Sequence, residues 1–347
     1  MRQVYVSDLN TYTLVDAPDP VIERPSDVIV KVTTTTVCGS DAHILAGHMH
    51  TPWGFPLGHE FVGVVHQVGA AVSNFSPGDR VVAPAAPWCG TCPACRRGQI
   101  QRCERGGIFG SGAAYGGLGG GHAEYVRVPW ADSCLSRIPD GVSDAQALTV
   151  GDILTTGWTA VRNAVTAPGK TLLVFGVGPV GLCAVHTARL YGVASVIAVD
   201  TVTERLNLAK ALGADHVIDP SRQEVVAAVA ELTGGRGAEA VVDAAGVQAT
   251  VSAWEPVAAI GARIAMVGIP AAPVELNLTA MLEKNITLWT GLGDLGQMNT
   301  LLALIESGKL DPSPIFTETV PFDNIENAIG EFVNRKHGLV KPLVQVS

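Results

Sequence analysis

The sequence predicts an α/β fold in which a doubly wound parallel sheet is combined with a second, β-rich domain. At 347 residues the chain is longer than one hydrophobic core usually allows, so two domains are expected. A glycine-rich loop lies between an apolar run and a helical pattern within residues 171–190, and strand and helix patterns alternate after it. Residues 1–150 instead carry short β-branched runs separated by proline and glycine.

The strongest signal is the loop Gly176-Val177-Gly178-Pro179-Val180-Gly181, which follows the strand-like run at residues 171–175. Gly176 permits a tight turn, Gly178 lets the backbone approach a pyrophosphate, and Gly181 lets the helix pack closely on its strand. The helix N-terminus offers amide groups to phosphates, and Pro179 fits in the first helical turn. A glycine-rich loop without a ligand is the alternative, but the strand and helix around the loop favour a Rossmann dinucleotide site.

The cofactor is indicated by Asp200, at the end of the next predicted strand, residues 195–199. It lies 19 residues after Gly181, where a carboxylate can accept hydrogen bonds from the adenosine ribose and would repel a 2′-phosphate. The sequence therefore favours NAD over NADP.

Further candidate strands follow Asp200 and alternate with helical segments. They are residues 215–218, 240–243, 263–267 and 286–290. With the two strands already named, they make the six of a complete doubly wound dinucleotide domain. Helical patterns at residues 298–307 and 323–335 end the chain, and the β-rich part carries candidate strands at residues 27–33, 62–68, 80–83 and 123–128.

Composition excludes several functions. Hydrophobic residues make up 47% of the chain and charged residues 16%, which indicates a packed protein and not a disordered one. The net charge of -9 argues against nucleic acid as a partner. No apolar run reaches membrane-spanning length, and the first ten residues lack the apolar core of a signal peptide. We therefore expect a cytoplasmic protein with reduced cysteines and a small-molecule substrate.

Four of the seven cysteines have the spacing Cys89-x2-Cys92-x2-Cys95-x7-Cys103. Four thiolates on a compact lobe predict a closed, structural zinc site. An iron–sulfur cluster is the alternative, but the last spacing and the absence of proline after Cys103 argue against it. A DNA-binding finger is disfavoured by the missing histidines. His122, Cys134 and Cys183 have no partner at ligand spacing and are expected to be structural.

A second candidate metal site begins at Cys38 and continues at Gly58-His59-Glu60. A thiolate and an imidazole are good zinc ligands, and a catalytic zinc needs only three protein ligands. Taken singly, Cys38 could be a small buried hydrophobe and His59 a core histidine. Asp152 is the one acid in an apolar stretch, where both metal binding and a helix N-cap remain open.

The chain carries, in this order, Cys38, Gly58-His59-Glu60, the four-cysteine lobe and the glycine loop. In this combination it resembles, over essentially its full length, the zinc-containing alcohol dehydrogenases of the medium-chain dehydrogenase/reductase superfamily. The resemblance implies a GroES-like catalytic domain at residues 1–153, completed by residues 296–347. It implies a Rossmann NAD-binding domain at residues 154–295. Members of that family form homodimers and homotetramers, so a homo-oligomer, with the tetramer favoured, is expected.

Within the family, the stretch Gly151-Asp152-Ile153-Leu154-Thr155-Thr156-Gly157 is similar to bacterial secondary-alcohol dehydrogenases, in which an aspartate is the third zinc ligand. The match implies that Cys38, His59 and Asp152 bind the catalytic zinc, with Glu60 as an exchangeable ligand or a neighbour of the ligands. It also implies a proton relay in which Ser40 takes the proton of the alcohol and His43 passes it on.

The same resemblance implies the remaining coenzyme contacts. Asp200 departs from several aspartate-ligand relatives, which carry a small residue there and prefer NADP, and Arg205 is close enough in sequence to pair with it or to reach the adenosine. The other implied contacts are backbone groups of Val267, Gly268, Ile269 and Leu292 at the nicotinamide, Thr156 beside the ring, and Lys341 at the pyrophosphate.

The implied function is a zinc-dependent oxidoreductase that transfers a hydride between NAD(H) and a secondary alcohol or ketone, or a related alcohol or aldehyde. Polyol or threonine dehydrogenase activity is the alternative within this chemistry. A nonenzymatic NAD-binding zinc protein would lack the relay or an open-site ligand, and a zinc-free quinone reductase would lack the cysteine lobe. Two zinc ions per chain, one catalytic and one structural, are therefore expected.

Overall fold

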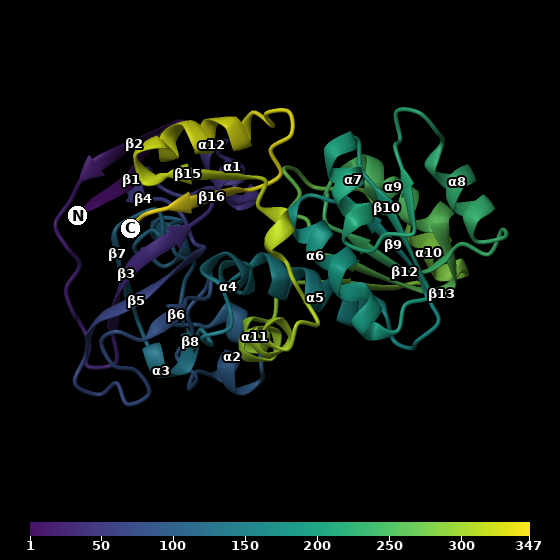
Figure 1. Ribbon diagram of the computed structural model, residues 1–347. Helices are drawn as coiled ribbons and strands as arrows, with labels where there is room; N and C mark the ends of the chain where they lie inside the picture. The colour runs from purple at the N-terminus through teal and green to yellow at the C-terminus, as the bar shows by residue number, and fades with distance from the viewer. The chain divides into compact units, whose positions relative to one another are not determined.

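The computed structural model describes residues 1–347, which divide into two compact units (Figure 1). Unit 1 consists of Met1–Thr155 together with Asp294–Ser347, and unit 2 of Thr156–Gly293. The polypeptide therefore leaves unit 1 once and returns to it. No helix in either unit combines the length and the hydropathy needed to cross a membrane.

Unit 2 contains one six-stranded sheet with the strand order β11-β10-β9-β12-β13-β14, and every pairing in it is parallel. This confirms the predicted doubly wound sheet, in which the order reverses beside the first strand. The strands are β9 (Thr171–Phe175), β10 (Ser195–Val199), β11 (His216–Ile218), β12 (Ala238–Asp243), β13 (Ala258–Met266) and β14 (Thr287–Thr290).

Helices follow the strands of unit 2 in alternation and cover the sheet on two faces (Figure 1). Val229 and Trp254, from two of these helices, pack over Leu173 of β9. On the other face, a Cβ at Gly181 would lie 3.6 Å from Val174. The helices are α5 (Ile153–Ala164), which begins in unit 1, then α6 (Pro179–Ala188), α7 (Thr203–Ala211), α8 (Val225–Leu232), α9 (Gln248–Val257) and α10 (Leu278–Glu283).

Unit 1 is built on two sheets. The larger has the order β15-β16-β3-β5-β6-β8, with β7 also pairing with β3, and the smaller has the order β2-β1-β4. The predicted β-rich part is confirmed. Its strands are β1 (Arg2–Asp8), β2 (Thr11–Asp16), β3 (Val28–Thr35), β4 (Phe55–Pro56), β5 (Phe61–Val68), β6 (Arg80–Val82), β7 (Tyr125–Val128), β8 (Ser136–Arg137), β15 (Glu318–Pro321) and β16 (Pro342–Gln345).

The helices of unit 1 are short and lie between the strands. Ile44 and Leu45, on the first of them, are fully buried in a core with Val4 of β1 and Ile329 of the last helix, and this packing fixes the helix that carries Ser40 and His43. The helices are α1 (Gly39–Leu45), α2 (Pro93–Arg96), α3 (Ala131–Cys134), α4 (Asp144–Val150), α11 (Met298–Glu306) and α12 (Ile325–Val333).

The packing of the glycine loop gives a first prediction. A Cβ at Gly181 would lie 1.9 Å from the carbonyl oxygen of Gly176, whereas a Cβ at Gly178, where φ is -66°, would meet only the tip of Arg205 at 3.8 Å. Gly181→Ala should therefore lower the free energy of unfolding by about 1–3 kcal/mol, as overpacking does. Gly178→Ala is the control and should change it by less than about 0.5 kcal/mol. Denaturant midpoints measure both, and equal stability of the two variants would contradict the packing.

Candidate functional site

Four side chains from three separate segments meet in unit 1. Cys38 immediately precedes α1, His59 and Glu60 immediately precede β5, and Asp152 immediately precedes α5. One ligand atom from each of these residues lies within 4.8 Å of the others. A thiol, an imidazole and two carboxylates are thus brought to one point.

The spacing of three of these groups fits a tetrahedral divalent ion. Cys38 Sγ lies 3.5 Å from Asp152 Oδ2, and His59 Nε2 lies 3.4 Å from the same oxygen. For tetrahedral zinc with bonds of about 2.3 Å to sulfur and about 2.0–2.2 Å to nitrogen and oxygen, these separations are about 3.6 and 3.4 Å. The donor set and its geometry therefore fit an open zinc site, with three protein ligands and one position for a small molecule.

A buried carboxylate fixes the orientation of His59. Asp41 Oδ1 lies 3.2 Å from His59 Nδ1, and Asp41 Oδ2 accepts the Cys38 N–H at 2.8 Å. Burial lowers the pKa of His59, but the charge of Asp41 and the contact with Asp152 outweigh it, so this pKa lies well above its usual value. Burial raises the pKa of Asp41, yet its two histidine neighbours, His59 and His122, hold it far below its usual range. Nδ1 of His59 thus lies beside Asp41, and Nε2 faces Cys38 and Asp152.

Glu60 is fully buried beside this group and is paired with Lys341. Lys341 Nζ donates to Glu60 Oε1 at 2.8 Å and to the Val37 carbonyl oxygen at 3.0 Å, whereas Glu60 Oε2 has no hydrogen-bond partner. The expectation that Lys341 faces a pyrophosphate is wrong for this conformation, since its side chain is 0% exposed and its ammonium group is directed to Glu60. Lys341 instead supplies a buried positive charge among carboxylates.

Ser40 and His43, the predicted proton relay, lie three residues apart on α1. Ser40 Oγ is 3.0 Å from His59 Nε2, the nitrogen that faces the metal position. His43 Nδ1 is 3.2 Å from His48 Nδ1. Partial burial lowers the pKa of His43, and the charge of His48 lowers it further. His43 is therefore neutral near pH 7 and able to accept a proton.

The four-cysteine lobe forms a second, closed group of ligands. The sulfur atoms of Cys89, Cys92, Cys95 and Cys103 all lie within 4.8 Å of one another. Cys92 Sγ and Cys103 Sγ are 3.9 Å apart, close to the roughly 3.8 Å between two ligands of a tetrahedral zinc with bonds of about 2.3 Å. Burial raises the pKa of Cys89, but hydrogen bonds from Thr91 and Cys92 outweigh it and bring this pKa to about 6. Burial and the neighbouring thiols raise the pKa of Cys95 to about 12.

The glycine loop of unit 2 has the geometry that its sequence predicts. Gly176 has φ of +76°, and a Cβ there would lie 2.8 Å from that of Ala245. Asp200 accepts the Val177 N–H at 2.9 Å with Oδ2 and the Val202 N–H at 2.9 Å with Oδ1, and Arg205 lies 3.9 Å from Oδ2. Each carboxylate oxygen can accept a second hydrogen bond, so Asp200 both closes the loop and keeps acceptor capacity.

The other predicted coenzyme contacts also belong to unit 2. Val267 and Gly268 follow β13, where both amides donate to the Asp243 carbonyl oxygen, at 2.9 and 3.0 Å. Ile269 and Leu292 are each 39% exposed, which is high for such side chains and leaves apolar surface for a ligand. Thr156 lies beside Gly293, at which a Cβ would be 2.5 Å from its hydroxyl oxygen. Their roles toward a coenzyme stay a prediction.

Two residues near the open site were missed in the sequence. Asp41 was not singled out, and His122 was assigned a structural role without a partner. In the structure His122 is 0% exposed and its Nε2 lies 3.6 Å from Asp41 Oδ2. The spacing Cys38-x2-Asp41 was the only local signal for Asp41, and no spacing connects His122 to the site.

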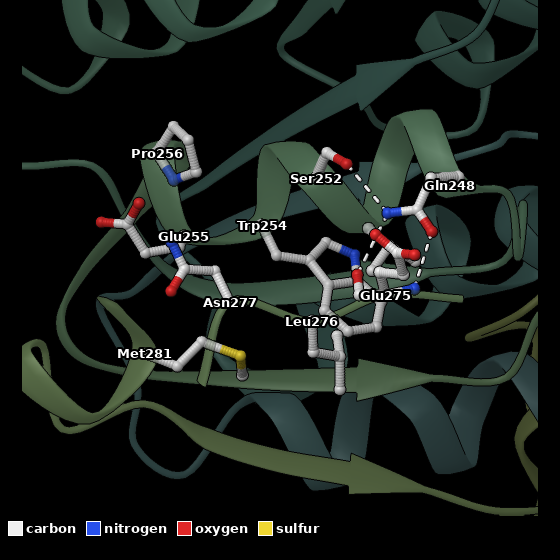
Figure 2. A pocket seen from close by; sticks show the side chains of 10 residues that line it. Gln248, Ser252, Trp254, Glu255, Pro256, Glu275, Leu276, Asn277 and Met281 are labelled. Atoms are coloured by element: carbon white, nitrogen blue, oxygen red, sulfur yellow. Dashed lines mark hydrogen bonds between the residues drawn. The ribbon is translucent and has the colours of Figure 1, made fainter. Parts of the chain in front are cut away.

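A separate cavity of about 430 Å³ lies in unit 2 beside α9 (Figure 2). Gln248 Nε2 donates to Ser252 Oγ and to the Glu275 carbonyl oxygen, both at 3.0 Å, and Gln248 Oε1 accepts the Glu275 N–H at 2.7 Å. These polar groups satisfy one another, and the lining contains no thiol, imidazole or predicted site residue. We therefore do not assign the chemistry to this cavity.

These features define a zinc-type medium-chain dehydrogenase. The chain combines a Rossmann unit with a GroES-like β unit that holds one closed and one open group of metal ligands. Comparison with protein families agrees with this class. The model for the alcohol dehydrogenase GroES-like domain matches residues 24–140, and the model for zinc-binding dehydrogenases matches residues 179–307. The chain belongs to the zinc-containing alcohol dehydrogenase family, so it is an oxidoreductase.

Individual relatives are similar over nearly the whole chain. An alcohol dehydrogenase of Cupriavidus necator is 36% identical, with 94% of each chain covered. The scyllo-inosose 3-dehydrogenase of Thermotoga maritima is 32% identical, over 90% of this chain and 85% of its own. The solved structure of an alcohol dehydrogenase from Thermus sp. ATN1 has a TM-score of 0.95 at 35% identity, with both chains fully covered.

The electrostatics of the open site predict pH-dependent metal binding. His59 and Cys38 must lose their protons before they bind zinc, and both pKa values are raised, that of Cys38 by burial first and by Glu60 second. Zinc affinity at this site should therefore fall between pH 8 and pH 6, by about tenfold per pH unit for each proton displaced. Chelator competition at several pH values measures it.

The control for this prediction is Asp41→Asn. It removes the charge that raises the pKa of His59, so the fall in affinity should move to lower pH. An affinity independent of pH across this range would contradict the assignment of His59 and Cys38 as ligands.

Proposed function

We propose that the protein is an NAD-dependent alcohol dehydrogenase that interconverts secondary alcohols and ketones, with one catalytic and one structural zinc per chain. The observation that carries the catalytic assignment is the convergence of Cys38, His59 and Asp152 at spacings suited to a tetrahedral ion. The four-cysteine lobe, which has four thiols and no other donor type, supports the structural zinc.

In this proposal Cys38, His59 and Asp152 hold the zinc, which when bound supplies a Lewis acid for the substrate oxygen, while the coenzyme supplies the hydride chemistry. Asp41 keeps the Nδ1 hydrogen of His59 in place, so that Nε2 faces the metal.

The substrate hydroxyl would lose its proton to Ser40 Oγ, which lies 3.0 Å from His59 Nε2. As Ser40 accepts that proton, its own hydrogen would pass to a hydroxyl of the nicotinamide ribose, and from there a proton would pass to His43, which would release it to solvent. The lowered pKa of His43 supports this step, since the imidazole is unprotonated at neutral pH.

A polyol dehydrogenase is the second candidate function. It is favoured by the 32% identity to a protein that acts on a cyclic polyol derivative, scyllo-inosose. The two candidates share the same metal and relay residues and differ only in the groups that contact the rest of the substrate.

The first test concerns the open site. Asp152→Ala removes one ligand and should lower kcat/KM by roughly 10³-fold, since metal polarisation of the substrate oxygen contributes several kcal/mol. NADH binding, followed by fluorescence, should persist, and zinc content should fall from two ions per chain to one. Cys134→Ser, a buried thiol outside both ligand groups, is the matched control and should retain both.

The assay uses a panel of secondary alcohols, polyols and their ketones with NAD(H) and NADP(H). Turnover of polyols alone would favour the second candidate. Full activity of a metal-free Asp152→Ala variant would contradict the mechanism, and a two-zinc wild type without any turnover would favour a nonenzymatic NAD-binding protein.

The cofactor preference gives a separate prediction. Asp200→Ala should raise the preference for NADP relative to NAD by about ten- to a hundredfold, because the carboxylate that repels a 2′-phosphate is removed. The control is Asp215→Ala, an exposed carboxylate before β11 that is paired with Arg189. The ratio of kcat/KM for the two coenzymes is measured, and an unchanged ratio in Asp200→Ala would overturn the role of this residue.

A further inference from the structure

His122 lies at the end of the glycine-rich segment before β7 and packs against the loop that precedes His59. Its side chain is 0% exposed, and its backbone N–H donates to the Leu57 carbonyl oxygen at 3.1 Å. Gly58 has φ of +97°, and a Cβ there would lie 2.5 Å from two atoms of the His122 ring. The ring is therefore held in one place, directly behind the segment that carries a metal ligand.

The first ring nitrogen of His122 faces Thr35. Thr35 Oγ1 lies 3.0 Å from His122 Nδ1 and 2.8 Å from the Glu60 carbonyl oxygen, to which its hydroxyl can donate. Thr35 thus links the ring to the backbone of the segment that carries His59 and Glu60.

The second ring nitrogen faces a negative charge. His122 Nε2 lies 3.6 Å from Asp41 Oδ2 and makes no hydrogen bond to any other group. Both groups are 0% exposed, so the His122 ring lies directly against the carboxylate that contacts His59.

We propose that His122 is a positioning residue of the open metal site, which holds the Asp41 carboxylate in place and through it the ring of His59. The inference rests on the proposed catalytic zinc. It adds a third member to the chain of contacts from His59 through Asp41, and it gives a role to a residue that touches neither metal nor substrate.

Two substitutions separate this role from simple packing. His122→Phe retains a ring of similar volume but removes both ring nitrogens, whereas His122→Gln lacks the ring but can place an amide donor near the Nε2 position. If His122 positions Asp41, zinc affinity at the open site should fall by about 10- to 100-fold in His122→Phe and by less in His122→Gln. A packing role predicts the reverse order.

Affinity is measured on the full-length protein by chelator competition, with the zinc of the four-cysteine lobe as the internal reference for correct folding. Nitrogen-15 NMR of the zinc-loaded wild type provides the second readout. We expect the ring-nitrogen signals of His59 to shift in His122→Phe and to shift less in His122→Gln.

The outcomes are distinct. A His122→Phe variant that binds zinc as the wild type does would overturn the inference while leaving the proposed function intact. If His122→Phe loses the lobe zinc as well, open-site affinity retained in His122→Gln supports the inference, and affinity lost there overturns it. A wild type with no zinc outside the lobe would refute the proposed function itself.

Discussion

The compensation of buried charge is the constraint on which the open site depends. Asp41 and Glu60 are fully buried, and an unpaired carboxylate in such a position would cost several kcal/mol. Each therefore needs a positive partner or a set of hydrogen-bond donors. Glu60 has Lys341, and Asp41 has the Cys38 amide and two histidines. The same donors that make burial tolerable also fix the direction of each ligand, so stability and metal geometry depend on the same contacts.

The fold could be predicted from the sequence because its signals are local. The loop from Gly176 to Gly181 requires its glycines for contacts within a few residues, and the 1.9 Å approach to the Gly176 carbonyl explains why Gly181 has no side chain. The four cysteines lie within 15 residues, so their spacing alone predicts that they share an ion. In contrast, the hairpin of β1 and β2 was not predicted, although Val4 and Val6 are buried on either side of the less buried Tyr5.

The surroundings of the open site could not be predicted, because they depend on contacts between residues far apart in the chain. Thr35 and His122 are 87 residues apart, and Glu60 and Lys341 are 281 residues apart. A lysine near the end of the chain gives no indication that it will be buried against a carboxylate. The resemblance to a family supplied Cys38, His59 and Asp152 as candidate ligands, but it did not supply Asp41 or His122, whose roles appear only when the side chains are placed.

The position of Lys341 also connects the metal site to the order in which unit 1 is completed. Lys341 immediately precedes β16, which pairs with β3 and with β15. Until β16 is added to the sheet, Glu60 lacks its counter-charge, and the carboxylates beside Cys38 repel one another without compensation. Two cations then serve the site from different directions, Lys341 from the C-terminal segment and a divalent ion when one is bound. Each lowers the cost of burying the carboxylates, so they share the compensation of the same anionic groups.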